Sequence, residues 1–132
     1  MSCSDFIADQ LTIIRNGIMA KKKAVIIKRS GFMEGIVGII KREGYIEDYK
    51  VIEDNKQGKI KVYLKWLSDE TPVMEALKKV STPGRRQYVS SGKVQNIMGG
   101  VGFSIISTSK GLLTDKEAQE QGVGGELVCS IW

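Results

Sequence analysis

The chain has 132 residues, of which 42% are hydrophobic and 27% are charged. This balance predicts a soluble protein built of one domain or two small ones, and it excludes a disordered chain. No apolar run approaches the ~20 residues that a bilayer span needs, and the first residues carry no basic region of the kind that opens a signal peptide.

The charged residues are unevenly distributed along the chain. Residues 1–67 contain 13 Lys and Arg against 8 Asp and Glu, whereas residues 68–132 contain 7 of each. The net charge of +5 therefore comes from the first half, where it would attract a partner rich in phosphate. The alternative is a cytosolic protein that is merely mildly basic.

Histidine is absent, and the two cysteines, Cys3 and Cys129, lie far apart in the sequence. Without His the chain lacks the usual general base and the commonest metal ligand. We therefore expect no catalytic site, no metal site and no cofactor. Two free thiols are typical of a reducing compartment.

The first half of the chain predicts the element order α-β-α-β-β. Apolar residues at helical spacing indicate a helix over residues 5–19, and the apolar run Ala24–Ile27 indicates a short buried strand. Ser30 can cap a second helix, which ends near Gly44 because glycine suits the left-handed position after a helix. Residues 45–65 then predict a hairpin whose second arm alternates apolar residues with Lys59, Lys61, Tyr63 and Lys65.

A polar junction at residues 68–72 separates the second half. The fold class expected is α+β, and the junction is the best candidate for a boundary between residues 1–67 and residues 68–132, which are mainly β with short helices. Residues 73–80 fit either a helix or a strand. We also expect strands over residues 85–89, 103–106 and 127–132, a Pro-Gly turn over residues 82–85, and short helices over residues 90–100 and 114–121, the second with a capping box of Thr114 and Glu117.

Two polar stretches flank the last predicted helix. The first, Ser107, Thr108, Ser109 and Lys110, offers hydroxyls and a cation that suit base edges, ribose hydroxyls and phosphates. The second, Gly122–Glu126, could form a backbone nest for an anion but lacks the ending of a P-loop. The structural alternatives are a strand-to-helix loop and a tight approach of two strands. Glu126 cannot attract phosphate, so we expect it to accept from a base amino group or to position a neighbouring donor.

Two further basic groups are candidates for contacts with nucleic acid. Arg86 and Tyr88 follow the Pro-Gly turn with Arg85, so two arginines and an aromatic converge in a short strand. The lysines of the second hairpin arm have two possible interpretations. They could contact phosphate, or they could form a solvated face opposed by Glu47 and Asp48 across the hairpin, and the second interpretation is preferred. Cys129 is expected in the core.

The run from Ser107 to Ala118 (STSKGLLTDKEA), followed by Gly122–Leu127, strongly resembles the C-terminal signature of the small-subunit ribosomal protein eight family of bacteria and organelles. Other parts of the chain agree with that family in the same order. They are Asp5–Asp9 with Ile14–Gly17, Lys41–Ile46, Val80–Arg86, and Tyr88. The resemblance covers the whole chain, and Gln87 departs from it, because the family usually has an apolar residue there.

The resemblance implies a fold of two small, tightly packed domains. It also implies a protein that binds the central domain of small-subunit ribosomal RNA early in assembly, beside neighbouring small-subunit proteins. The RNA-binding residues that it implies are Ser107, Thr108, Ser109, Lys110, Gly124, Gly125, Glu126 and Tyr88, with backbone contacts near Ser4 and Ser30. Some members of the family also bind their own message. The resemblance is compatible with a location on a cytoplasmic ribosome and with one on an organellar ribosome.

Two other functions compete with this one. An RNA-binding regulator without a ribosomal home would use the same residues, and cosedimentation with small subunits would distinguish it. A small enzyme acting on a nucleotide or phosphoester would need a base or a metal ligand set, for which the chain offers little.

Overall fold

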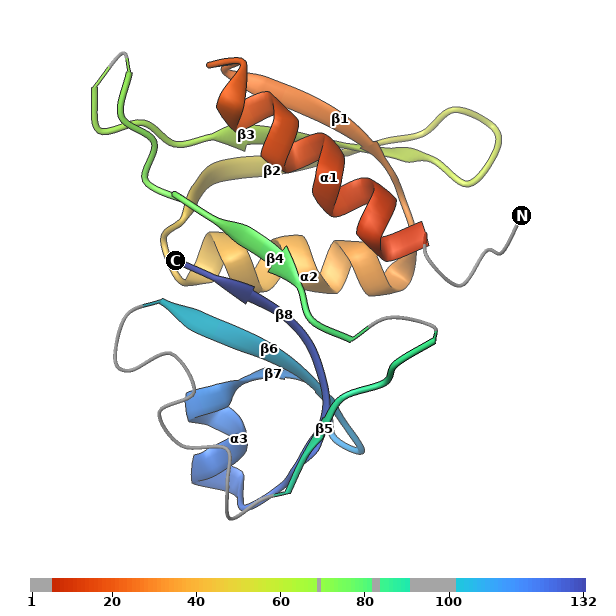
Figure 1. Ribbon diagram of the computed structural model, residues 1–132. Helices are drawn as coiled ribbons and strands as arrows, with labels where there is room; N and C mark the ends of the chain where they lie inside the picture. Colours follow the sequence, from red (N-terminus) through yellow and green to blue (C-terminus); the bar gives the residue numbers. More distant parts are fainter. Residues whose placement is uncertain (1–5, 69, 82–83, 91–101) are drawn as a thin grey trace. The chain divides into compact units, whose positions relative to one another are not determined.

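The computed structural model of the protein describes residues 6–68, 70–81, 84–90 and 102–132. The chain divides into two compact units, Met1–Glu75 and Ala76–Trp132. Each unit contains helix and an antiparallel sheet, so the protein is α+β as predicted (Figure 1). Among the described residues, no helix is both long and apolar enough to cross a membrane.

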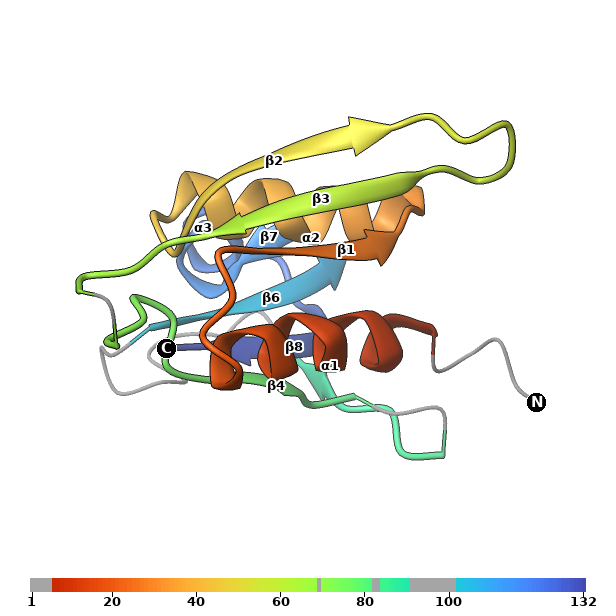
Figure 2. The same ribbon diagram turned by 90° about the horizontal axis from the view of Figure 1, so that it is seen from above.

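The N-terminal unit has the predicted order α-β-α-β-β. Its elements are α1 (Phe6–Met19), β1 (Ala24–Lys28), α2 (Gly31–Arg42), β2 (Ile46–Ile52) and β3 (Lys59–Leu64). The strands pair in the order β1-β3-β2, so β3 is the central strand. Figures 1 and 2 show α1 and α2 on the same side of this sheet, which leaves the other side of the strands free of both helices.

The core of the N-terminal unit lies between these helices and the sheet. Leu11 of α1, Ile36 and Ile40 of α2, and Ile60 and Val62 of β3 are each at most 1% exposed. Burial of side chains of this kind stabilises a fold by about 1.5–3 kcal/mol each. The helical and alternating periodicities of the sequence place these residues on the buried sides, as predicted.

Both predicted ends of α2 are confirmed. The Ser30 hydroxyl accepts a hydrogen bond from the backbone N–H of Met33 at 3.0 Å, which caps the first turn. Gly44 follows the helix with a φ of +85°, a conformation that glycine adopts without strain. The strand predicted at Ala24–Ile27 forms, but it is not buried on both sides: Ile26 is 52% exposed.

The C-terminal unit is built around its last strand. Its elements are β4 (Leu77–Lys79), β5 (Tyr88–Val89), β6 (Phe103–Thr108), β7 (Gly111–Thr114), α3 (Asp115–Gln121) and β8 (Gly125–Ile131). β8 pairs along one edge with β6 and along the other with both β4 and β5, and β6 also pairs with β7. A buried cluster of Ile106, Leu113 and Ala118, with Val89, Val123 and Leu127 packed on it, attaches α3 to one face of the sheet.

Several boundaries in this unit differ from the predictions. Within residues 73–80 the structure forms a strand, β4, and the strand expected over residues 85–89 is shortened to β5. The predicted strand-to-helix loop after Ile106 is wrong. The chain continues as β6 to Thr108, turns, and returns as β7, whose four residues are too few for a clear periodic signal. Residues 91–100 of the helix expected over residues 90–100, and the first two of the four residues of the turn expected over residues 82–85, lie outside the described residues.

The helix that follows β7 has the predicted capping box. The Thr114 hydroxyl accepts from the Glu117 N–H, and the Glu117 carboxylate accepts from the Thr114 N–H, each at 3.1 Å. The helix ends at Gly122, whose φ of +67° is left-handed. This cap directs the chain from α3 into β8.

Candidate nucleic-acid interface

Three of the predicted site residues form one row across the C-terminal sheet. Glu126 of β8 lies opposite Tyr88 of β5 on one side and opposite Ser107 of β6 on the other. Side chains of directly opposed residues lie on the same face, about 4.5–5.5 Å apart at Cβ. We call Tyr88, Glu126 and Ser107 the central row. The register thus brings together residues that are separated by up to 38 positions in the sequence.

The central row lies on the face of the sheet that is turned away from α3. The next residues along the strands, Ile106 and Leu127, belong to the cluster under α3, and successive strand residues face opposite ways. Tyr88 is 72% exposed, so its ring is available for a flat contact. A polar row with an exposed aromatic ring is suited to a large partner with an irregular surface.

The carboxylate of Glu126 is already bound by neighbouring side chains. Its Oε2 accepts from the Ser81 hydroxyl at 2.5 Å and from Arg86 Nη1 at 3.1 Å. Ser81 is fully buried, and its hydroxyl in turn accepts from the Gln87 N–H at 3.1 Å. Of the two roles predicted for Glu126, this geometry supports positioning a neighbouring donor.

Glu126 therefore holds Arg86 beside the central row. The guanidinium has five N–H donors, of which this contact uses one. The Arg86 side chain is 40% exposed, which leaves donors able to meet a phosphate or a base edge. Sequence reasoning missed Ser81, whose hydroxyl links the Gln87 backbone to Glu126 of β8. Its signal was weak because a lone serine before a turn has no distinctive pattern.

The predicted run of three hydroxyls is divided by the strand. Ser107 belongs to the central row, whereas Thr108 faces the side of α3, because neighbouring strand residues point in opposite directions. The Thr108 hydroxyl donates to the Gly111 carbonyl at 2.8 Å and accepts from the Lys110 N–H at 3.0 Å. It closes the turn between β6 and β7, and the two turn residues, Ser109 and Lys110, are exposed at the tip.

The glycines before Glu126 have different surroundings. Gly124 precedes β8 and is half-buried. A Cβ on Gly125 would overlap the backbone carbonyl of Ser107 and lie 3.1 Å from Thr108 Cα. Gly125 therefore allows β8 and β6 to approach closely, which was the structural alternative for this segment.

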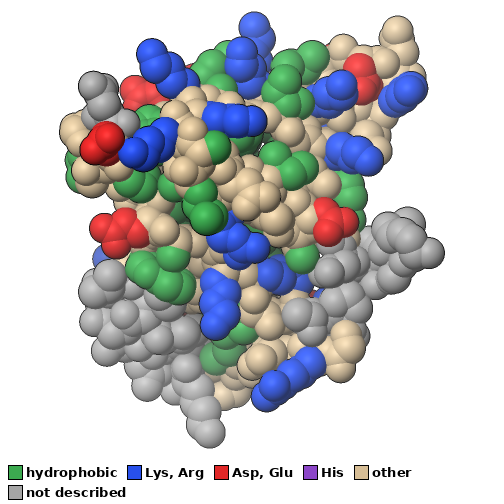
Figure 3. Space-filling model, turned by 45° about the horizontal axis from the view of Figure 1, so that its top comes forward, with side chains coloured by type: hydrophobic (Ala, Val, Ile, Leu, Met, Phe, Trp, Pro, Cys, Tyr) green, Lys and Arg blue, Asp and Glu red, His purple; other side chains and the backbone are tan. Residues whose placement is uncertain are grey.

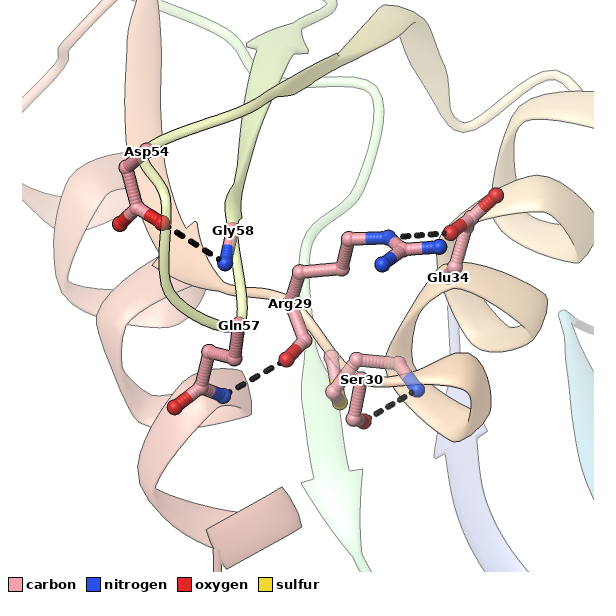
Figure 4. Close-up of polar contacts among 7 residues, drawn as sticks. Arg29, Ser30, Glu34, Asp54, Gln57 and Gly58 are labelled. Atoms are coloured by element: carbon pink, nitrogen blue, oxygen red, sulfur yellow. Dashed lines mark hydrogen bonds and ion pairs between the residues drawn. The ribbon is translucent and has the colours of Figure 1, made fainter.

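The two helix starts that the resemblance implied lie in the N-terminal half of the chain. Ser4 lies outside the described residues. The Ser30 hydroxyl is used as the cap of α2, and its neighbour Arg29 binds Glu34 at 2.8 Å (Figure 4). The Arg29 carbonyl accepts from Gln57 Nε2 at 2.7 Å, so the hairpin loop is joined to this corner. The side chains of Arg29, Ser30 and Gln57 therefore make contacts within the N-terminal unit.

The register changes the interpretation of the basic face of the hairpin, on which Lys59, Lys61 and Tyr63 lie. Tyr63 lies opposite a carboxylate, but Lys59 and Lys61 do not. Of the two carboxylates expected to oppose this face, Asp48 lies opposite Tyr63, and its partner is Lys41 of α2 at 3.0 Å. Hydrogen bonds from Lys41 and from the Tyr49 N–H lower the pKa of Asp48. Lys61 lies opposite another lysine, Lys50.

Basic side chains are widely spread over the protein. In the view of Figure 3, Lys and Arg are dispersed over the visible face, with Asp and Glu placed singly among them. In the described part of the chain, no group of three or more His, Cys, Asp or Glu is placed to hold a metal ion. Cys129 is fully buried, as predicted for a core residue, and burial raises the pKa of its thiol to about 12.

The fold and the central row define a small α+β protein whose candidate site is a row of residues on one face of the C-terminal sheet, with an exposed aromatic ring and an anchored arginine. The family model described as ribosomal protein S8 matches residues 5–132. The chain belongs to the ribosomal protein S8 family, as the sequence resemblance predicted. Membership in this family identifies a structural protein and not an enzyme.

Curated relatives match the chain over its full length. The small ribosomal subunit proteins uS8 of Geobacter metallireducens and Geobacter sulfurreducens are each 48% identical to it over 132 residues, which is all of this chain and all of theirs. That of Moorella thermoacetica is 48% identical over 129 residues, or 98% of this chain and 99% of its own. The departure expected at Gln87 is compatible with the fold, because Gln87 joins the sheet through its backbone: its carbonyl accepts from the Leu127 N–H at 2.8 Å.

Proposed function

We propose that this chain is a structural component of the small ribosomal subunit that binds the central domain of the subunit's RNA directly and helps to organise assembly. The relatives are small ribosomal subunit proteins uS8, which supports a place for this chain in the small subunit. The observation that carries direct RNA binding is the central row, which places Tyr88, Glu126 and Ser107 side by side with Arg86 attached.

The chemistry of this surface suits RNA better than it suits a small ligand. A-form RNA hides its base edges in a narrow major groove, so proteins bind its shape, its 2′-hydroxyls and its splayed bases. The exposed Tyr88 ring can stack on a base. Ser107 can exchange hydrogen bonds with a ribose hydroxyl, and Arg86 can donate to phosphate while Glu126 holds it in place.

The tip of the β6–β7 hairpin extends this surface. Ser109 and Lys110 are exposed, and Thr108 fixes the turn that presents them. Gly124 and Gly125 bring backbone close to the row. We assign RNA reading to residues 68–132 and long-range attraction to the positive residues 1–67, on a ribosome in the cytoplasm.

Measurement of RNA affinity at one salt concentration tests this proposal. Replacement of Tyr88 by Ala removes one stacking surface, so we expect binding to a central-domain fragment to weaken by roughly 5- to 150-fold. Lys110→Ala should weaken binding to all RNAs alike, and Lys116→Ala, an exposed lysine on α3, is its matched control. If Tyr88→Ala and Lys110→Ala both bind as tightly as the parent, the central row and the tip are not the RNA site.

Glu126→Gln separates a reading role from a positioning role. The amide loses the charge that holds Arg86. We expect the variant to lose discrimination between the cognate RNA and a base-substituted one, with the salt dependence of binding nearly unchanged. Equal tightening on every RNA would show that Glu126 acts only as a repulsive charge near phosphates.

A regulatory role remains a separate hypothesis, including binding to the chain's own message. The same residues would serve it, so affinity for one RNA cannot distinguish the two functions. Cosedimentation of the tagged chain with small subunits is expected under the ribosomal proposal. Recovery of the chain only in free ribonucleoprotein would favour the regulator.

A further inference from the structure

The uncovered side of the N-terminal sheet carries lysines in an ordered array. Lys61 of β3 lies opposite Lys50 of β2 and Ile26 of β1. One row further along, Lys59 of β3 lies opposite Lys28 of β1 and Ile52 of β2. Opposed residues share a face, so each row presents two lysines and one isoleucine on the same side of the sheet. We call Lys28, Lys50, Lys59 and Lys61 the lysine face.

The four lysines are close to one another and have no carboxylate partner. Neighbouring strands are about 4.8 Å apart, and the two rows are separated by about 6.6 Å, which is two residues of strand. Within the described residues, no ion pair joins any of the four to an Asp or Glu; the acid at the end of this face, Asp48, pairs with Lys41. Like charges placed directly opposite each other destabilise a sheet. The repulsion among the four lysines therefore destabilises the free protein, and a negatively charged partner would offset it.

This face is also accessible within its own unit. Both helices of the N-terminal unit lie on the other side of the sheet (Figure 2). Lys28, Lys50 and Lys59 are exposed, and Ile26 is 52% exposed. Lys61 is partly covered, with its ammonium 5.2 Å from the centre of the Tyr63 ring. The sheet is thus an open surface whose chemistry is set by its lysines.

The positive surface continues around the edge of β1. Lys61 and Ile26 also line a hollow of about 690 Å³ beside that strand, together with Asn16 and Lys22. A partner lying across the strands would therefore meet positive charge beyond the sheet as well as on it.

We infer that the lysine face binds the phosphate backbone of a second RNA segment, separate from the segment read by the central row. This inference rests on the proposed function only in taking the polyanion to be ribosomal RNA. Lysine binds phosphate as a point charge, without the bidentate geometry by which arginine reads bases. A flat face with four lysines and no arginine suits a contact that is independent of RNA sequence.

A salt titration of the full chain on a central-domain RNA fragment tests the inference. The test variant changes Lys28, Lys50, Lys59 and Lys61 to Gln. The control changes Lys21, Lys23, Lys56 and Lys116, which are exposed lysines outside the face, to Gln and so removes the same charge. If all four lysines contact phosphate, the slope of log affinity against log salt should be shallower by roughly 3 in the test variant, at about 0.7–0.9 per contact. The control slope should change by less than about 1.

The results separate this inference from the proposed function. Equal slopes for the two quadruple variants would overturn the lysine face, whereas unaltered binding by Tyr88→Ala would overturn the central row. RNA footprinting should show two different segments losing protection in the Lys-to-Gln and Tyr88→Ala variants. Unchanged RNA binding with loss of incorporation into subunits would also refute the inference, since it would indicate an acidic protein partner. Removal of opposed like charges should not lower the thermal midpoint, so the test variant is expected to fold.

Discussion

Replacement of Gly125 by Ala tests whether this glycine serves the fold or leaves room for RNA. An added Cβ would overlap the Ser107 carbonyl and lie 2.9 Å from its carbon atom. Carbon atoms pack best at about 3.5–4.0 Å. The β6 and β8 backbones would therefore have to separate by at least about 0.6 Å at the point where Thr108 lies opposite Gly125.

The expected loss of stability follows from this displacement. Inserting a methyl group into a packed site costs about 1–3 kcal/mol. Loosening the adjacent strand hydrogen bonds adds about 0.5–1.5 kcal/mol for each bond lost. We expect Gly125→Ala to lower the free energy of unfolding by about 2–4 kcal/mol, which is a large part of the ~5–15 kcal/mol of a typical domain.

Urea unfolding followed by circular dichroism measures this loss. Gly84→Ala is the matched control, because no atom lies within 4 Å of the position of its Cβ. We expect that control to stay within about 0.5 kcal/mol of the parent. The reasoning fails if Gly125→Ala is as stable as the control. Loss of RNA binding by such a stable variant would show that the glycine leaves space for the partner instead.

Three further predictions concern the C-terminal unit. Thr108→Val should lower the free energy of unfolding by about 1 kcal/mol, because two turn hydrogen bonds are lost. It should also weaken RNA binding, because the tip of the hairpin is displaced. An unchanged urea midpoint together with an unchanged RNA affinity would refute this prediction. Thr114→Ala should cost about 0.5–2 kcal/mol by removing the capping box, also measured in urea, with no effect on RNA binding. The Cys129 thiol should resist alkylation in the native protein and react once urea unfolds it, as peptide mass spectrometry can show. Because its folded pKa is raised from 9.0 to about 12, stability should fall as pH rises between these values, and Cys129→Ala should reduce that fall.

The elements with strong local signals were predictable from the sequence. The second hairpin arm alternates cleanly, and it became β3 with Ile60, Val62 and Leu64 buried. The caps of α2 and α3 also follow from single residues with defined backbone preferences. These features depend on neighbours a few positions apart, which periodicity and capping rules describe well.

Strand pairing was harder to predict, because it depends on distant residues. β7 has four residues, and its identity as a strand comes from pairing with β6. β5 has two residues, paired with the start of β8. Such short segments carry little propensity of their own, so tertiary contacts decide their structure.

The same dependence limited the prediction of the site. The sequence placed Ser107 and Thr108 together as neighbouring hydroxyls, yet a strand turns adjacent side chains to opposite faces, and only Ser107 shares a face with Glu126. Tyr88 reaches that row because β5 and β4 use the same edge of β8. Strand register therefore decides which residues join the central row, and register is difficult to predict from a single sequence. Register also reveals the lysine face, since Lys50 lies opposite Lys61 in the uniform register that runs from the Ile52–Lys59 pair beside the hairpin loop to the Asp48–Tyr63 pair. A one-residue slip of β2 along β3 would turn Lys50 to the side of the helices, so the array of lysines depends on the hairpin loop that sets this register.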